Sequence, residues 1–143
     1  MPAKRNPKGF TEEERAAMRE RAREARARAR AGPAESELEV REKIATMPPA
    51  DRALAERIHT IVKAADPSLT ARTWYGMPAY YKDGELVCHF QDANKFKTRY
   101  ATLGFSDEAK LDDGHMWPVA FALTELTTAD EARIAALVKK AVG

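Results

Sequence analysis

The most chemically distinctive part of the sequence is an aromatic and basic stretch. It reads TWYGMPAYYKDGELVCHF over residues 73–90 and continues as KFKTRY over residues 95–100. Aromatic rings supply contact area and basic groups orient an anion, so this composition is typical of a small-ligand or peptide-binding site. The residues that we assign to such a site are Trp74, Tyr75, Met77, Tyr80, Lys97, Arg99 and Tyr100. The alternative is that these side chains complete the core.

Three glutamates form a second candidate site. Glu35, Glu39 and Glu42 have the spacing i, i+4, i+7, which places them on one side of a helix. A row of carboxylates repels itself, and a hard or borderline cation such as iron would relieve the repulsion. Arg41 and Lys43 lie close by, so a solvated, charge-balanced helix face is the alternative.

Motifs of enzyme chemistry are not visible in the sequence. The three histidines, His59, His89 and His115, lack compact metal-ligand spacing, and there is no phosphate-binding loop, nucleophile elbow or dinucleotide fingerprint. The single cysteine, Cys88, alternates with apolar residues and is most simply a buried apolar side chain. We therefore expect a binding protein and not an enzyme.

Charge is unevenly distributed along the chain. Residues 1–31 contain ten Lys and Arg and five Glu, whereas the whole chain has a formal net charge of +2. Seven arginines between residues 15 and 30 could contact phosphates, so nucleic acid is a candidate partner for residues 4–30. The interleaved glutamates favour a solvated, salt-bridged helix instead, and no groove-reading motif is present.

Length and composition indicate the class of protein. The chain has 143 residues, of which 44% are hydrophobic and 32% charged, and this suits one globular domain with its own core. One cysteine excludes an internal disulfide and fits a reducing compartment. The sequence shows neither a run of about 20 apolar residues for a membrane span nor the apolar segment of a secretory signal. We expect a soluble cytoplasmic protein.

Four helices are predicted from capping signals and apolar spacing. Three of them open with capping boxes, at Thr11–Glu14, Ser36–Glu39 and Thr128–Glu131. The remaining helix is predicted over residues 50–65, from its regular apolar stripe. The first of the four has only Met18 as a large apolar residue, so we expect it to be solvated or to protrude.

A period of two predicts strands in the middle of the chain, with Asp83-Gly84 as a hairpin turn. The predicted strands span residues 70–75, 79–82, 85–91, 95–103 and part of 116–126. Helices, then strands, then a closing helix predict an α+β fold, an antiparallel sheet with helices packed on one face. We divide the chain into a basic helical extension, residues 1–33, and an α+β domain, residues 34–143. The uncovered sheet face would carry the aromatic and basic residues, and it or the basic helix offers a surface for a homodimer.

Three segments carry a family resemblance. The stretches TWYGMPAYYKDGELVCHF, KFKTRYATLGFSDEAKLDDG and WPVAFALTEL resemble the YdhG-like family of small bacterial domains of unknown function, often labelled frataxin-like iron chaperones. The resemblance covers about residues 37–142. It implies an antiparallel sheet with helices on one face, loosely bound Fe²⁺ as cargo, and an iron-recipient protein as partner. The positions implied for iron are Glu35, Glu39 and Glu42.

Overall fold

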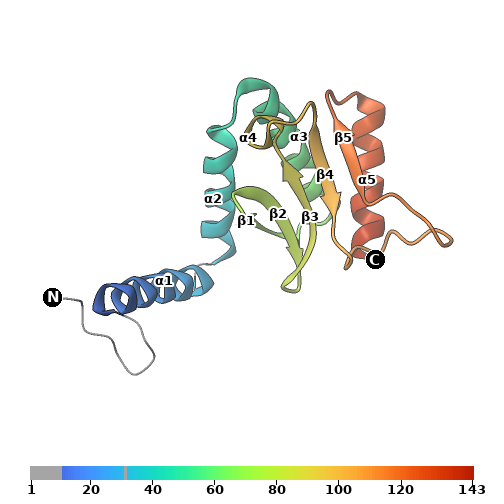
Figure 1. Ribbon diagram of the computed structural model, residues 1–143. Helices are drawn as coiled ribbons and strands as arrows, with labels where there is room; N and C mark the ends of the chain where they lie inside the picture. Colours follow the sequence, from blue (N-terminus) through green and yellow to red (C-terminus); the bar gives the residue numbers. More distant parts are fainter. Residues whose placement is uncertain (1–10, 31) are drawn as a thin grey trace. The chain divides into compact units, whose positions relative to one another are not determined.

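The structure is a computed structural model that describes residues 11–30 and 32–143 (Figure 1). The chain divides between Gly32 and Pro33 into two compact units. In the first unit, helix α1 spans Glu12–Arg30. Thr11 Oγ1 accepts a hydrogen bond of 3.1 Å from the backbone N–H of Glu14, which is the capping contact expected from the sequence. Three glutamates in its first turn complement the helix dipole.

The second unit holds the remaining elements in an order that begins with two helices and ends with one. The helices are α2 (Pro33–Ala45), α3 (Pro49–Ala65), α4 (Ala93–Phe96) and α5 (Thr128–Val142). The strands are β1 (Thr70–Trp74), β2 (Met77–Lys82), β3 (Glu85–Gln91), β4 (Ala101–Phe105) and β5 (Ala120–Leu123). None of the helices in the described part of the chain is both long and apolar enough to cross a membrane.

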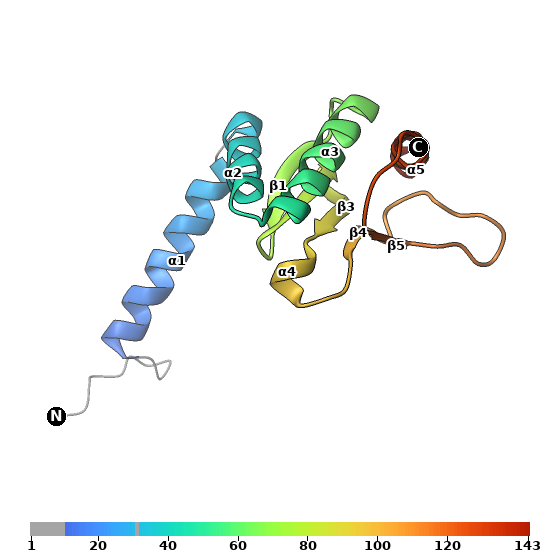
Figure 2. The same ribbon diagram turned by 90° about the horizontal axis from the view of Figure 1, so that it is seen from above.

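The five strands form one sheet in the order β1-β2-β3-β4-β5, and every neighbouring pair is antiparallel. Figure 2 shows α2, α3 and α5 side by side on one side of this sheet. The predicted α+β fold with an antiparallel sheet is therefore confirmed. Short hairpin connections explain the strand order, because consecutive strands joined by tight turns pair with one another.

The core lies between the sheet and the three long helices. Cross-strand pairs place Tyr80 opposite Cys88, Cys88 opposite Phe105 and Phe90 opposite Leu103, so these side chains share the covered face. The helices contribute the buried side chains of Val40, Ile44, Ile58, Val62, Ile134 and Val138. Burial raises the pKa of the Cys88 thiol to about 12, which agrees with its expected role as an apolar core residue.

The predicted strand over residues 95–103 is wrong in its first half. Residues Ala93–Phe96 form the short helix α4, Lys97 has a left-handed φ of 54°, and β4 begins only at Ala101. Asp92 caps this turn by accepting a hydrogen bond of 3.3 Å from the N–H of Lys95. The capping contact and the packing of α4 outweigh the alternating pattern on which the prediction relied.

Two predicted helix starts are also shifted. Helix α2 begins at Pro33, whose missing N–H costs nothing in a first turn, and Ser36 lies inside the helix with its hydroxyl donating to the Pro33 carbonyl. Helix α5 is capped one residue earlier than expected. Thr127 Oγ1 accepts from the N–H of Asp130 at 3.2 Å, and the Asp130 carboxylate accepts from the N–H of Thr127 at 2.9 Å.

Candidate ligand-binding site at the turn between β1 and β2

The turn between β1 and β2 consists of two residues, Tyr75 and Gly76. Their φ angles are 49° and 75°, and Trp74 pairs with Met77 across the turn. Positive φ at both central positions is the pattern of a type I′ hairpin, which suits glycine well and tyrosine poorly. The Tyr75 side chain is nevertheless 79% exposed. Neither backbone preference nor burial therefore accounts for an aromatic residue at this position.

Helix α4 lies against this turn. Lys95 Nζ donates a hydrogen bond of 2.7 Å to the Tyr75 carbonyl oxygen. The helix is itself held by Asp51, a buried carboxylate in the first turn of α3, which accepts from the N–H groups of Ala93 and Asn94 at 3.2 and 3.0 Å. Segments that are far apart in the sequence are thus fixed together at one end of the sheet.

Exposed aromatic side chains gather on these two segments. In the described part of the chain, the large aromatic residues classed as exposed are Tyr75 and, with 39% and 37% exposure, Phe96 and Tyr100. Lys95 Nζ lies 5.4 Å from the ring centroid of Phe96, and Arg99 Cζ lies 5.4 Å from that of Tyr100. These are cation–π distances. The helix α4 and the loop that follows it thus present cations and rings together.

A small aromatic cluster supports the turn on the sheet face opposite α2, α3 and α5. The Trp74 ring lies edge-on to His89 at a centroid distance of 5.0 Å and to Tyr75 at 5.1 Å. Met77 and Ala79 are buried although they are not part of the main core cluster, and they pair with Trp74 and His89 across the strands. We call Trp74, Tyr75, Met77, Ala79 and His89 the turn cluster.

Gly104 gives His89 its place on this face. A Cβ at Gly104 would lie 2.4 Å from His89 Cε1, so the imidazole ring lies directly over the glycine. Burial lowers the pKa of His89, because the charged imidazolium would lose water there. The ring is therefore neutral at neutral pH and contributes a flat, weakly polar surface next to Trp74.

The residues that were assigned to the site from the sequence lie in different parts of the structure. Trp74 and Tyr75 lie at the turn, and Met77 lies beneath them. Lys97, Arg99 and Tyr100 lie in the segment between α4 and β4. The fold adds four residues that the assignment from the sequence left out: Lys43 and Lys95, which the pattern did not indicate, and His89 and Phe96, which it indicated only as candidates for the uncovered face. Asp92 is the sequence signal that could have located Lys95 and Phe96, because an aspartate at this position caps the helical turn in which both residues lie.

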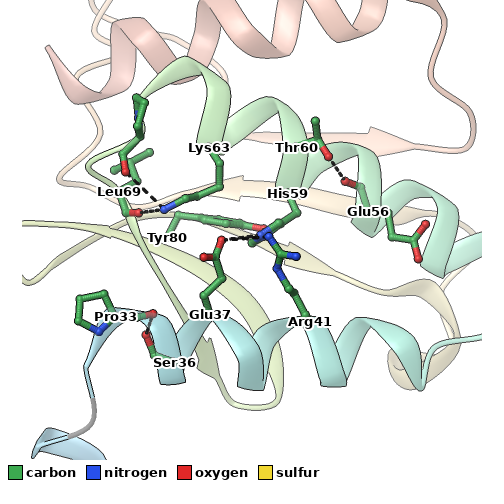
Figure 3. A network of polar contacts seen from close by, with 11 residues as sticks. Pro33, Ser36, Glu37, Arg41, Glu56, His59, Thr60, Lys63, Leu69 and Tyr80 are labelled. Atoms are coloured by element: carbon green, nitrogen blue, oxygen red, sulfur yellow. Dashed lines mark hydrogen bonds and ion pairs between the residues drawn. The ribbon is translucent and has the colours of Figure 1, made fainter.

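Tyr80 does not belong to this site, and its assignment is wrong. It faces the helices, is fully buried, and its hydroxyl lies 2.9 Å from His59 Nδ1 (Figure 3). Strand alternation explains the error, because Tyr80 stands on the face opposite to that of its neighbours Ala79 and Tyr81. Burial raises the pKa of Tyr80 well above its usual value, so the hydroxyl keeps its proton.

His59 connects this buried network to a groove between α2 and α3. Its Nε2 lies 3.0 Å from Glu37 Oε1 (Figure 3). The groove has a volume of about 320 Å³ and is lined by Arg41, Ile44, Glu56, His59 and Thr60. Because both ring nitrogens of His59 already have partners, neither is free to act as a base or a metal ligand. His59 therefore forms part of the wall of the groove but offers no reactive nitrogen to a ligand there.

The three glutamates proposed for iron lie apart from other ligands. Glu35 and Glu42 are exposed, and Glu39 accepts a hydrogen bond of 2.7 Å from Thr73 Oγ1. Among the described residues, no group of three or more His, Cys, Asp or Glu side chains is placed to hold a metal ion. Iron binding through these residues stays a hypothesis from the sequence, which an Fe²⁺ titration can test, and so does an iron-recipient partner.

The nucleic-acid and homodimer predictions are likewise untested. Residues 4–10 of the proposed nucleic-acid segment lie outside the described residues, and its helical part is α1.

Comparisons with known proteins give no support for a family. The chain matches no protein-family model, no curated protein and no solved structure. The YdhG-like resemblance therefore stays a prediction, and any functional proposal depends on the geometry of the site.

Proposed function

We propose that the protein is a cytoplasmic small-ligand-binding module that holds a planar ligand at the turn between β1 and β2. The observation that carries the proposal is the exposure of Tyr75 on a two-residue turn that disfavours tyrosine. A non-glycine residue held at positive φ costs free energy, and such costs concentrate at functional positions. A ring that is kept in solvent at this cost is suited to stacking against another ring.

The surroundings of Tyr75 favour a small ligand with an aromatic or planar group. Trp74 holds the Tyr75 ring edge-on, and His89 holds Trp74 in turn. This support reduces the conformational freedom that a ligand would otherwise have to remove on binding. Phe96 lies near the turn, because Lys95 Nζ contacts both the Phe96 ring and the Tyr75 carbonyl oxygen.

Binding of an uncharged planar molecule tests the proposal. We would titrate the full chain with adenosine and follow protein fluorescence, since Trp74 contacts Tyr75 directly. Tyr75→Asn removes the ring, and asparagine tolerates positive φ, so the turn is retained. The matched control is Met116→Ala, which removes another exposed apolar side chain, in the connection between β4 and β5.

The expected result is saturable binding that Tyr75→Asn weakens by about tenfold or more, the loss expected for one stacking contact. Met116→Ala should leave the affinity unchanged. Equal affinity of the wild-type protein and Tyr75→Asn, with both folded by circular dichroism, would remove Tyr75 from the site and contradict the proposal.

A further inference from the structure

Two lysine side chains from different helices meet at Gly76. A Cβ placed on Gly76 would lie 2.4 Å from Lys95 Nζ and 3.7 Å from Lys43 Nζ. Because both distances are measured from one point, the two ammonium nitrogens lie within about 6 Å of each other, where like charges repel. Lys43 comes from the last turn of α2 and Lys95 from α4. We call these two side chains the lysine pair.

Neither member of the lysine pair forms an ion pair with a carboxylate of the described residues. The ion pairs of the described residues involve Arg41, Arg57, His59 and Lys82, and neither member of the lysine pair takes part. Lys95 donates to the Tyr75 carbonyl oxygen, a neutral acceptor. Lys82 gives the contrast, because it contacts the Asp66 carboxylate at 3.0 Å. In the described part of the chain, neither ammonium nitrogen of the pair therefore lies in an ion pair with a carboxylate, and Glu39, one helical turn from Lys43, accepts from Thr73 Oγ1.

The fold holds Lys95 at this glycine through a chain of contacts. Asp51 holds α4 through two backbone N–H groups, and α4 carries Lys95 to the turn. Glycine at position 76 suits the φ of 75° and leaves room for Lys95 Nζ, which would have to move if a Cβ were present there. A buried carboxylate and a short helix thus place Lys95 against the backbone of the turn that carries Tyr75, and Lys43 reaches the same glycine from α2.

We propose that the lysine pair binds the phosphate group of a phosphate monoester whose planar ring packs on Tyr75, the class of ligand to which mononucleotides belong. A phosphate monoester carries a charge of about −1.5 to −2 near neutral pH, which matches two ammonium groups. Lysine binds phosphate as a point charge and needs no planar fork. The ring contact rests on the proposed function, whereas the phosphate contact rests on the lysine pair alone.

The test compares three probes that separate ring from phosphate, namely adenosine, adenosine monophosphate and inorganic phosphate. Affinities would be measured by calorimetry on the full chain at low and moderate salt. The variants are Lys43→Gln, Lys95→Gln, the double variant, and Lys95→Arg, which keeps the charge. The matched control is Lys139→Gln, which removes one exposed positive charge from the last turn of α5.

For the wild-type protein we expect adenosine monophosphate to bind about tenfold or more tightly than adenosine, and added salt to reduce the difference. The double variant should bind both equally while its affinity for adenosine stays unchanged. Lys95→Arg should keep most of the preference, and Lys139→Gln should keep all of it.

The two proposals fail in different ways. Equal wild-type affinity for adenosine and its monophosphate overturns the phosphate site but leaves the ring site standing. Phosphate binding that the double variant loses, without any adenosine binding, supports the lysine pair and overturns the ring site. If Lys139→Gln weakens the binding of the monophosphate as much as Lys95→Gln does, the effect is one of non-specific charge. That result would overturn the lysine pair as a site. No binding of any probe overturns both.

Discussion

The Tyr80 hydroxyl and His59 Nδ1 lie 2.9 Å apart in the interior, between the sheet and α3. Because Tyr80 keeps its proton, it donates to Nδ1, and the Nε2–H of His59 then donates to Glu37. These two contacts join β2 to α3 and α3 to α2. In the described residues no buried side-chain nitrogen or oxygen lacks a hydrogen-bond partner, which agrees with a structural role for the network.

Tyr80→Phe is expected to lower the free energy of unfolding by about 1–3 kcal/mol, because it leaves the buried Nδ1 of His59 without a donor. Urea unfolding followed by circular dichroism measures the change. Tyr81→Phe is the control, because Tyr81 is only partly buried and its removal should change stability by less than about 0.5 kcal/mol. Equal effects of the two substitutions would contradict a stabilising hydrogen bond between Tyr80 and His59.

Stability should fall when the pH drops below about 6.5. Burial lowers the pKa of His59 from 6.5, opposed by Glu37 and assisted by the nearby charges of Arg41 and Lys63. Between 6.5 and the lowered pKa, the unfolded chain binds a proton that the folded chain does not. The loss is then up to about 1.4 kcal/mol per pH unit for this group. His89 acts in the same direction.

Unfolding curves between pH 7.5 and 5 would measure this dependence. His59→Gln should unfold more easily at every pH but show a flatter pH profile, because the titrating group is gone. If the variant's profile is as steep as that of the wild-type protein, His59 binds protons equally in the folded and unfolded states, which contradicts a lowered pKa in the folded protein.

The N-terminal cap of α5 predicts a difference between two adjacent threonines. Thr127→Ala should cost about 1 kcal/mol of stability because it removes the hydroxyl that accepts from Asp130. Thr128→Ala, in the first helical position, should be close to neutral. Thermal and urea unfolding of both variants would show the order, and the reverse order would restore the cap predicted from the sequence.

Gly104→Ala is expected to displace His89 and with it the Trp74 ring. The new methyl group would meet His89 Cε1 at 2.4 Å, and overpacking of this kind costs about 1–3 kcal/mol. Combining it with His89→Ala should recover much of the loss, since the colliding ring is then absent. A double-mutant cycle measured by urea unfolding gives the coupling, and additive effects would place the ring elsewhere.

The glutamates of α2 give a further prediction about iron. Wild-type protein and the triple variant Glu35→Gln, Glu39→Gln, Glu42→Gln should give the same anaerobic Fe²⁺ titration. The reason is that the described residues bring no three metal ligands together and Glu39 already accepts from Thr73. Mg²⁺ and Zn²⁺ serve as controls. Selective Fe²⁺ binding that the triple variant loses would instead support the iron-chaperone hypothesis.

Local patterns predicted the parts of the structure that depend on neighbours in the sequence. The α+β fold followed from helical spacing in residues 50–65, strand alternation in residues 85–91 and the hairpin signal at Asp83-Gly84. Helix α3 and strand β3 lie where these patterns indicated. Capping signals located the start of α1 at Thr11 and that of α5 within one residue, whereas the signal at Ser36 lies inside α2, which begins at Pro33.

The candidate site depends on contacts that no local pattern contains. Asp51 and Asn94 are 43 residues apart, Lys95 and Tyr75 are 20 apart, and Lys43 reaches Gly76 from another helix. The sequence established that the region is aromatic and basic and, by strand period, that neighbouring side chains face opposite ways. Which face α2, α3 and α5 cover, and hence that Tyr80 is buried while Tyr75 is exposed, was decided by packing. The reason is that burial of apolar area is non-directional and depends on the whole assembled core.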